Sequence, residues 1–170
     1  MSKIVAFGNQ KGGVGKSTVI AMTANALSQA PFNINLCVID CDRQQSLSEA
    51  RSFDLEDTVT VNYPILSMSV EDLQHKIHDL DQQYDLILMD TAGRLDHRVS
   101  VEKQETTKAL MYADFLFIPF RAGSFNLEAS IEYLKIANKL KAIRADSGRP
   151  LNYFGFINMY KDRSKTNAFL

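Results

Sequence analysis

The chain lacks tryptophan altogether and contains only two cysteines, Cys37 and Cys41. Their spacing does not match the ligand pairs of zinc sites, and a strand would hold the two sulfurs too far apart for a disulfide. The scarcity of cysteine therefore argues against a disulfide scaffold and against a zinc site. We expect two reduced, buried thiols, as is typical of a cytoplasmic protein.

Long hydrophobic runs and a strong excess of one charge are also missing. No run approaches the roughly 18 apolar residues of a membrane-spanning helix, and the first residues lack the apolar segment of a signal peptide. The net charge of −1 argues against a histone-like hold on nucleic acid, while leaving room for a local basic patch. A length of 170 residues, 45% of them hydrophobic, predicts a single domain, residues 1–170, with a substantial core.

A glycine-rich segment near the start is the most informative part of the chain. Residues 8–18 read Gly-Asn-Gln-Lys-Gly-Gly-Val-Gly-Lys-Ser-Thr and follow an apolar run at 4–7. A glycine-rich turn between a strand and a helix N-terminus directs backbone amides at an anion. The pattern fits the phosphate-binding loop G-x-x-x-x-G-K-[ST], except that Gln10 takes the first glycine position. We expect Lys16 to contact the terminal phosphates and Ser17 to ligate Mg²⁺.

These features predict a nucleotide site. A turn that merely caps a helix would explain the glycines but neither of the two lysines. The residues expected to bind the nucleotide phosphates are Lys11, Gly12, Gly13, Val14, Gly15, Lys16, Ser17 and Thr18.

Strand-like runs alternate with helical patterns along the rest of the chain. Two apolar runs, 34–40 and 84–90, each end in aspartate, as buried parallel strands do. This alternation predicts an α/β fold with a mostly parallel, twisted sheet and helices on both faces. Together with the glycine-rich loop at 8–18, it indicates a P-loop NTPase. Further strands are expected at 113–120, at 151–158 and, as an edge strand or loop, at 59–68. Helices are expected at 16–30, 44–51, from the capping box at Ser69, at 96–111, and from Ser124 to before Gly148.

Acidic residues at two strand ends suit the chemistry of phosphate hydrolysis. The active residues of open α/β sheets gather at the carboxyl ends of the strands, where we expect Asp40 and Asp90. Asp90 fits the acid that holds Mg²⁺ together with Ser17, directly or through water. Asp40 and Asp42 have a second interpretation, a solvated turn that follows a strand.

Residues 11–18 resemble the deviant Walker A box of the ParA/MinD family of ATPases. Gln10 is similar to the ParA branch, because MinD and nitrogenase iron proteins usually have glycine there. In that family the early lysine reaches across a dimer to the partner's nucleotide, which implies a catalytic role for Lys11 beside Lys16. The resemblance therefore implies an ATP-dependent homodimer.

Residues 40–44, Asp-Cys-Asp-Arg-Gln, resemble the second acidic box of the same family, D-x-D-P-Q. The resemblance implies that Asp42 positions or activates the attacking water. It also implies that Asp40 supports the metal shell or Lys16. Arg43 replaces the usual proline, which loosens the expected turn.

Residues 90–94, Asp-Thr-Ala-Gly-Arg, resemble the switch that follows the metal acid, and also the corresponding segment of signal-recognition-particle GTPases. We expect the Gly93 amide to contact a γ-phosphate, with an ordinary turn as the alternative. A matching asparagine in relatives contacts the adenine edge, which implies that role for Asn158, although asparagine also commonly caps turns. The guanine-specific T-K-x-D box is missing, so the expected cofactors are ATP and Mg²⁺.

Four basic residues near the end of the long helix raise the question of DNA binding. At about 100° per residue, Lys135 and Lys139 share a side, whereas Lys141 and Arg144 point elsewhere. A solvated helix is favoured over a DNA-binding stripe. Any DNA contact is expected to be non-specific and to be formed jointly by a nucleotide-loaded dimer.

The combined prediction is a ParA-type partition or positioning ATPase. ATP with Mg²⁺ would close a dimer that binds DNA non-specifically, and a ParB-like partner would stimulate hydrolysis. This cycle would drive partition or positioning of a plasmid, a chromosome or another cargo. Such a protein would be cytoplasmic, associated with the nucleoid and away from the membrane. Relatives usually continue with another strand and helices, so we expect either a minimal or a truncated member.

Two alternatives remain open. A MinD-like, membrane-associated spatial regulator needs a C-terminal amphipathic helix, and residues 165–170 are too few to form one. A nitrogenase-type iron protein needs a cluster-binding cysteine in the switch region, whereas Cys37 and Cys41 lie on another expected strand.

Overall fold

The computed structural model of the chain describes residues 1–10, 12–42, 47–49, 62–92, 104–121, 127–145 and 147–159. Six strands form one sheet with the order β3-β2-β4-β1-β5-β6, and each neighbouring pair is parallel. The predicted α/β fold with a parallel sheet is confirmed. The strands are β1 (Lys3–Phe7), β2 (Leu36–Asp40), β3 (Ile65–Ser67), β4 (Leu86–Asp90), β5 (Phe115–Arg121) and β6 (Asn152–Asn158).

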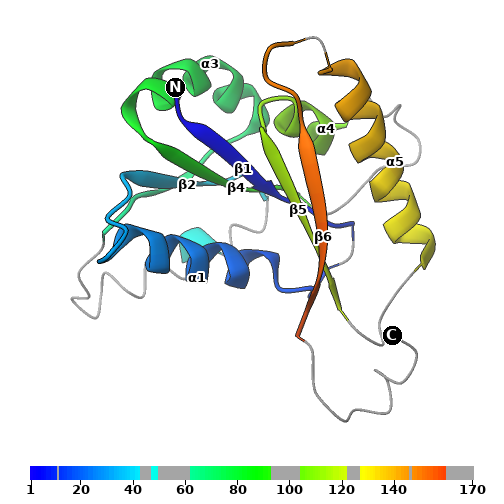
Figure 1. Ribbon diagram of the computed structural model, residues 1–170, viewed down its shortest axis with the longest axis horizontal. Helices are drawn as coiled ribbons and strands as arrows, with labels where there is room; N and C mark the ends of the chain where they lie inside the picture. The colour runs from blue at the N-terminus through cyan, green and yellow to red at the C-terminus, as the bar shows by residue number, and fades with distance from the viewer. Residues whose placement is uncertain are drawn as a thin grey trace.

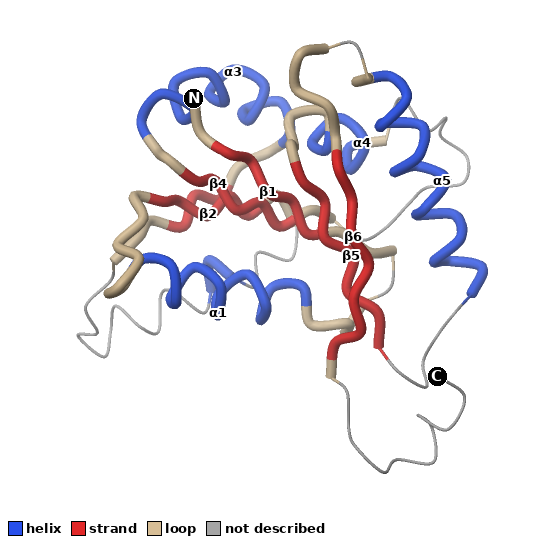
Figure 2. Tube along the Cα trace, in the orientation of Figure 1, coloured by secondary structure: helices blue, strands red, loops and turns tan. Residues whose placement is uncertain are grey.

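Helices lie on both faces of the sheet. Figure 1 shows α1 against one face and α3, α4 and α5 against the other, and the tube in Figure 2 shows the same layers. Among the described residues, no helix has both the length and the apolar content that crossing a membrane requires. The helices are α1 (Lys16–Ser28), α3 (Val70–Gln83), α4 (Glu105–Leu110) and α5 (Leu127–Ile143), and residues 47–49 are also helical.

Local signals set the ends of two helices as predicted. α1 ends shortly before Pro31, which has no amide hydrogen with which to continue it. At the start of α3, the Ser69 hydroxyl accepts a hydrogen bond from the Asp72 amide at 3.0 Å. This bond satisfies one of the free donors of the first turn, so Ser69 is the expected N-cap.

The helix expected over 96–111 is wrong at Gln104. Gln104 has extended backbone angles, φ −64° and ψ 134°, so that α4 begins at Glu105, and residues 93–103 lie outside the described residues. α4 packs against the core, because four of its six residues are buried: Thr106, Thr107, Ala109 and Leu110. Two of these four residues are threonines, so hydrophobic periodicity alone does not reveal the burial.

The alternation of side chains along the strands divides the core into two clusters. On β4, Ile87 and Met89 contribute to the cluster beneath α3, α4 and α5, whereas Leu88 belongs to the cluster beneath α1. Ile20 of α1 and Leu116 of β5 are both fully buried, one in each cluster. The sheet is therefore covered by apolar layers on both faces, as the short apolar strand runs predict.

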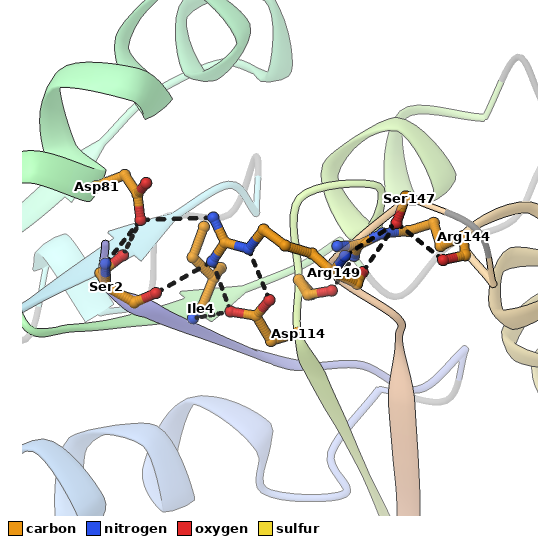
Figure 3. Close-up of polar contacts among 8 residues, drawn as sticks. Ser2, Ile4, Asp81, Asp114, Arg144, Ser147 and Arg149 are labelled. Carbon is orange, nitrogen blue, oxygen red and sulfur yellow. Dashed lines mark hydrogen bonds and ion pairs between the residues drawn. The ribbon is translucent and has the colours of Figure 1, made fainter.

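A network of hydrogen bonds and ion pairs joins segments at the amino ends of the strands, opposite the expected site (Figure 3). The Arg149 guanidinium donates two hydrogen bonds to Asp114, from Nε to Oδ1 at 2.9 Å and from Nη2 to Oδ2 at 2.7 Å. It also lies 3.5 Å from Asp81 Oδ1 and donates to the Ser2 carbonyl oxygen at 3.1 Å. The Ser2 hydroxyl in turn donates to Asp81 at 2.7 Å. Sequence reasoning missed this network because its members lie far apart along the chain.

The network keeps two buried carboxyls ionised. Burial alone would raise the pKa of Asp114, but hydrogen bonds from Arg149 and from the Ile4 amide leave that pKa below its ordinary value. Burial acts in the same direction on Asp81, and hydrogen bonds from Ser2 outweigh it, so the pKa of Asp81 is also lowered. Carboxyls with lowered pKa values stabilise the fold at neutral pH, and this contribution disappears as pH falls below their ordinary pKa.

We expect Arg149→Leu to reduce the free energy of unfolding by about 2 to 3 kcal/mol at pH 7, because it leaves two buried carboxylates without their cation. The difference from wild type should shrink as pH falls from about 5 to about 3, because protonation then neutralises the orphaned carboxyls. Urea unfolding at several pH values measures both effects. Arg149→Lys keeps the charge without the paired hydrogen bonds, so its free energy of unfolding should lie between those of wild type and Arg149→Leu. A leucine variant as stable as wild type at pH 7 would contradict this assignment.

Candidate functional site

The glycine-rich loop joins the central strand β1 to α1 at the carboxyl edge of the sheet. Gly13 and Gly15 have φ angles of 73° and 84°, which glycine adopts without strain. A Cβ atom on Gly15 would lie 2.5 Å from Asn158 Nδ2, so this position also has no space for a side chain. α1 starts directly after Gly15 with no side-chain cap. The amides of its first turn therefore suit an anion, as predicted.

Lys16 is the residue of this loop whose burial is least expected. Its exposed fraction is 9%, although lysine side chains usually lie in water. Its positive charge reaches Asp90, where it acts to lower the carboxyl pKa. An ammonium group that is largely withdrawn from water interacts more strongly with phosphate than an exposed one does.

The end of the loop contacts the end of β4. The Ser17 hydroxyl donates a hydrogen bond to Asp90 Oδ2 at 2.5 Å. The other carboxylate oxygen, Oδ1, is buried and has no hydrogen-bond partner among the described residues. A hydroxyl beside a carboxylate with an unpaired buried oxygen is an oxygen-ligand set of the kind that Mg²⁺ prefers. Ser17 and Asp90 therefore fit the predicted metal site.

The raised pKa of Asp90 is also consistent with a residue that binds a metal ion. Burial raises the pKa of Asp90 to about 6, the hydrogen bond from Ser17 and the charge of Lys16 oppose the rise, and the charges of Asp40 and Asp42 add to it. A carboxylate that is 1% exposed and near two other acids is costly to ionise without a cation. A divalent ion would remove that cost.

Asp40 lies beside Asp90, because the two residues are register partners in the parallel ladder of β2 and β4. Its carboxylate accepts hydrogen bonds from the Ser48 amide at 3.2 Å and hydroxyl at 3.3 Å, and from the Asp42 amide at 3.2 Å. Burial raises the pKa of Asp40 and these bonds oppose the rise. Asp40 thus fixes the backbone that carries Asp42, whose own side chain is partly buried.

Two asparagines tie the loop to the neighbouring strands. Asn158 Nδ2 donates to the Val14 carbonyl oxygen at 2.8 Å, and Asn9 Nδ2 donates to the Pro119 carbonyl oxygen at 2.7 Å. The structure thus brings Asn158 to the phosphate loop, while its contact with adenine stays a prediction. Sequence reasoning missed Asn9, although an amide side chain two residues after the end of β1 was an available signal.

Two threonines hold the residues that follow Asp90. The Thr91 hydroxyl donates to the Phe7 carbonyl oxygen at 3.0 Å, which ties the end of β4 to β1. The Thr106 hydroxyl of α4 donates to the Ala92 carbonyl oxygen at 2.8 Å. Thr91 and Ala92, the first residues after Asp90, are therefore anchored to β1 and to α4. Thr91 belongs to the 90–94 motif, although no role was predicted for it, and no local pattern marked Thr106.

The predicted site residues fall into two groups, those outside the described residues and those that the structure places. Lys11 and Gly93 lie outside the described residues, so their predicted contacts with the nucleotide stay predictions. The described members of the site come from the ends of β1, β2, β4 and β6, as predicted for an open α/β sheet. They are Gly12, Gly13, Val14, Gly15, Lys16, Ser17, Thr18, Asp40, Asp42, Asp90 and Asn158.

The basic residues of α5 and its C-terminal end do not form one surface. Arg144 is 5% exposed and donates a hydrogen bond to the Ala113 carbonyl oxygen, so it is not accessible to DNA. Lys141 Nζ lies 5.8 Å from the centre of the Tyr153 ring. The expectation of a solvated helix is therefore wrong for Arg144, which is buried, and confirmed for Lys135, which is exposed.

Comparison with known sequences relates this site to a family. Residues 5–167 match the family described as the CobQ/CobB/MinD/ParA nucleotide-binding domain. One relative, Uncharacterized protein BBD21 of Borreliella burgdorferi, is 36% identical over 80 residues, which are 47% of this chain and 28% of that protein. The chain therefore aligns with only about a quarter of this relative's length.

Several solved structures share the fold. A plasmid partition protein from Borrelia burgdorferi has a TM-score of 0.73 at 22% identity, with 99% of this chain and 83% of that chain covered. A Borrelia burgdorferi B31 protein bound to AMPPNP has a TM-score of 0.72 at 22% identity, with 99% and 80% covered. The pNOB8 ParA bound to nonspecific DNA has a TM-score of 0.54 at 21% identity, with 86% and 61% covered.

Proposed function

Because the chain belongs to the CobQ/CobB/MinD/ParA nucleotide-binding domain family, we propose that it is a ParA-type partition ATPase that binds ATP with Mg²⁺. The observation that carries this proposal is the hydrogen bond between Ser17 and Asp90, which joins the phosphate loop to the metal acid. A loop that bound an anion only to cap a helix would need no buried carboxylate beside its serine. The AMPPNP complex of a structural relative supports the choice of nucleotide.

Each residue of the site has its own role in the proposed hydrolysis of the phosphoanhydride bond. Lys16 and the amides of the loop bind the phosphates and balance their charge, while Ser17 and Asp90 hold the cation. The bound Mg²⁺ supplies further neutralisation of charge on the transferred phosphoryl group. Asp42 orients the attacking water and accepts its proton, and Asp40 keeps Asp42 in place through the Asp42 amide.

The proposed cycle uses hydrolysis as a switch. Lys11 of one protomer reaches the nucleotide of the other and closes an ATP-dependent homodimer. The dimer binds DNA non-specifically, as a ParA of the same fold does, and a ParB-like partner stimulates hydrolysis and release. The protein would then act in the cytoplasm on the nucleoid and move or position a plasmid, a chromosome or another cargo.

The switch is tested by co-sedimentation with DNA and by phosphate release, both with and without ATP. We expect wild type to bind DNA only with ATP, since the DNA surface belongs to the dimer. Asp42→Ala should bind DNA with ATP yet hydrolyse it at least about 100-fold more slowly, because the general base is lost while the phosphate contacts remain. Lys11→Ala should bind ATP but fail to dimerise or bind DNA.

A matched control is Asp79→Ala, which removes an exposed aspartate near the end of α3, at the amino ends of the strands and opposite the site. It should behave as wild type in both assays. DNA binding by wild type that ignores nucleotide would refute the switch. Nucleotide-dependent binding to anionic liposomes in place of DNA would instead indicate the MinD-like regulator.

A further inference from the structure

Thr106 is a buried polar residue of α4 whose hydroxyl bonds outside its own helix. It is 2% exposed and is the second residue of α4, which begins at Glu105. A threonine inside a helix often donates to the carbonyl three or four residues before it, but here those two positions precede the helix. The Thr106 hydroxyl donates instead to the Ala92 carbonyl oxygen at 2.8 Å. The bond therefore joins the start of α4 to the second residue after Asp90.

Ala92 is also held from the side of β1, through its neighbour Thr91. The Thr91 amide donates to the Phe7 carbonyl oxygen at 3.3 Å, and the Thr91 hydroxyl donates to the same oxygen at 3.0 Å. Phe7 is the last residue of β1, directly before the phosphate loop. The backbone at residues 91 and 92 is therefore fixed between the strand that leads into the phosphate loop and the start of α4.

A fixed carbonyl at Ala92 also fixes the direction of the amide that follows it. Gly93 lies outside the described residues, but its N–H shares one peptide unit with the Ala92 carbonyl. In a planar, trans peptide unit the C=O and the N–H point in opposite directions. A carbonyl that points toward α4 therefore turns this N–H away from α4. Since α4 and α1 lie on opposite faces of the sheet (Figure 1), the N–H is directed to the side on which the phosphate loop leads into α1.

The phosphate loop lies next to this part of the backbone. Ser17, the second residue of α1, donates to Asp90 Oδ2, and Asp90 is only two residues before Ala92. The charge of Lys16 also acts on the Asp90 carboxyl. A phosphate bound by Lys16 and the loop amides would therefore lie beside the end of β4. A backbone N–H that is already oriented there binds an anion without a cost of reorganisation.

We propose that Thr106 is a positioning residue for the terminal phosphate of ATP, because it holds the Ala92 carbonyl and thereby directs the next N–H at the nucleotide. This inference rests on the proposed function, in which ATP occupies the phosphate loop. Thr106 acts only through the peptide unit that it holds, as residues behind a binding site commonly do. The donor serves the third phosphate, so the Thr106 hydroxyl affects the binding of ATP analogues and not that of ADP.

The test compares two adjacent, similarly buried threonines. Thr106→Val is nearly isosteric and removes the hydroxyl that holds Ala92, whereas Thr106→Ser keeps that hydroxyl. Thr107→Val is the matched control, because Thr107 is 3% exposed and its hydroxyl has no hydrogen-bond partner within the described part of the chain. Calorimetric titrations with AMPPNP and with ADP, each with Mg²⁺, give a ratio of two affinities for every variant.

We expect Thr106→Val to bind AMPPNP about fivefold more weakly than wild type, the effect of one lost hydrogen bond, and to bind ADP within about twofold of wild type. Thr106→Ser should restore the wild-type ratio of affinities, and Thr107→Val should keep it. A residue that only stabilised the fold would change both affinities alike or neither. The ratio therefore separates positioning of the terminal phosphate from a contribution to stability.

Two results would overturn the inference while the proposed function stands. In the first, Thr106→Val keeps the wild-type ratio, which would leave Thr106 with a structural role alone. In the second, Thr106→Ser changes the ratio as much as Thr106→Val does, which would show that the hydroxyl is not the cause. Thr106→Ala gives the same comparison if the valine variant does not fold. A wild type that binds neither nucleotide would refute the proposed function and the inference together.

Discussion

Lys16→Ala is expected to weaken ATP binding by about 100-fold or more and to remove ATP hydrolysis. Lys16 opens α1 and is 9% exposed as a residue, so its charge is expected to interact with the phosphates more strongly than that of a fully solvated lysine. Each charge-assisted hydrogen bond contributes about 1.5 to 3 kcal/mol, and the loss of two such bonds corresponds to about the stated factor. The fold should change little in stability, because alanine suits the first turn of a helix.

Calorimetric titration with ATP and Mg²⁺ measures the affinity, and phosphate release measures turnover. The matched control is Lys76→Ala on α3, which removes an exposed lysine. This control should keep the affinity of wild type within about twofold, since surface substitutions away from a site have small effects. Retention of ATP binding by Lys16→Ala would show that the loop does not hold the terminal phosphates.

Asp90→Asn is expected to stop hydrolysis while making the free protein more stable at pH 7.5. The asparagine is nearly isosteric and can still accept a hydrogen bond from Ser17, but it binds Mg²⁺ poorly because it is neutral. Without its charge, the cost of holding a desolvated carboxylate disappears. We expect a gain of about 2 kcal/mol in the free energy of unfolding and a loss of turnover of at least about 100-fold.

The pH dependence follows from the direction of the shift. Burial raises the pKa of Asp90 from 3.8 to about 6, despite the opposing hydrogen bond from Ser17. A group with a raised folded-state pKa contributes stability that is complete below its unfolded pKa and is lost as pH rises through the folded value. Wild type should therefore lose stability relative to Asp90→Asn between about pH 4 and pH 7, and the two should converge at lower pH.

Urea unfolding at several pH values, with and without Mg²⁺ and nucleotide, measures this difference. Adding both ligands should raise the stability of wild type and leave that of Asp90→Asn almost unchanged, because the variant lacks the metal acid. Asp79→Asn on the exposed surface of α3 serves as the isosteric control. A less stable Asp90→Asn at every pH would contradict the account of Asp90 as a desolvated acid.

The predicted parts of this molecule are those that local patterns determine. Short apolar runs that end in aspartate predicted β2 and β4, and parallel strands bring their carboxyl ends to one edge. Asp40 and Asp90 are accordingly register partners. The phosphate loop was predicted equally well, since Gly15 has the positive φ that its place in the pattern requires. These features depend on residues close together in the sequence or on general rules of topology.

The features that were missed depend on burial of polar groups, which no local pattern reveals. Arg144 reads as one of several basic residues near the end of a helix, yet tertiary packing buries it against the Ala113 carbonyl oxygen. Tyr133 of α5 is fully buried, although its side chain carries a polar hydroxyl. The bond from Asn158 to Val14 joins residues 144 positions apart. Such pairings are set by the complete fold rather than by composition or periodicity.

The place of β1 in the sheet has a consequence for how the protein is made. β1 is the first strand in the chain, but its ladder partners are β4, through pairs such as Lys3 with Leu86, and β5, through pairs such as Val5 with Phe115. β1 is therefore synthesised first, and its backbone can be paired on each side only after β4 and β5 have been synthesised. Such distant pairing slows folding. We therefore expect the nucleotide-binding site to form only after most of the sheet has been synthesised, late in translation.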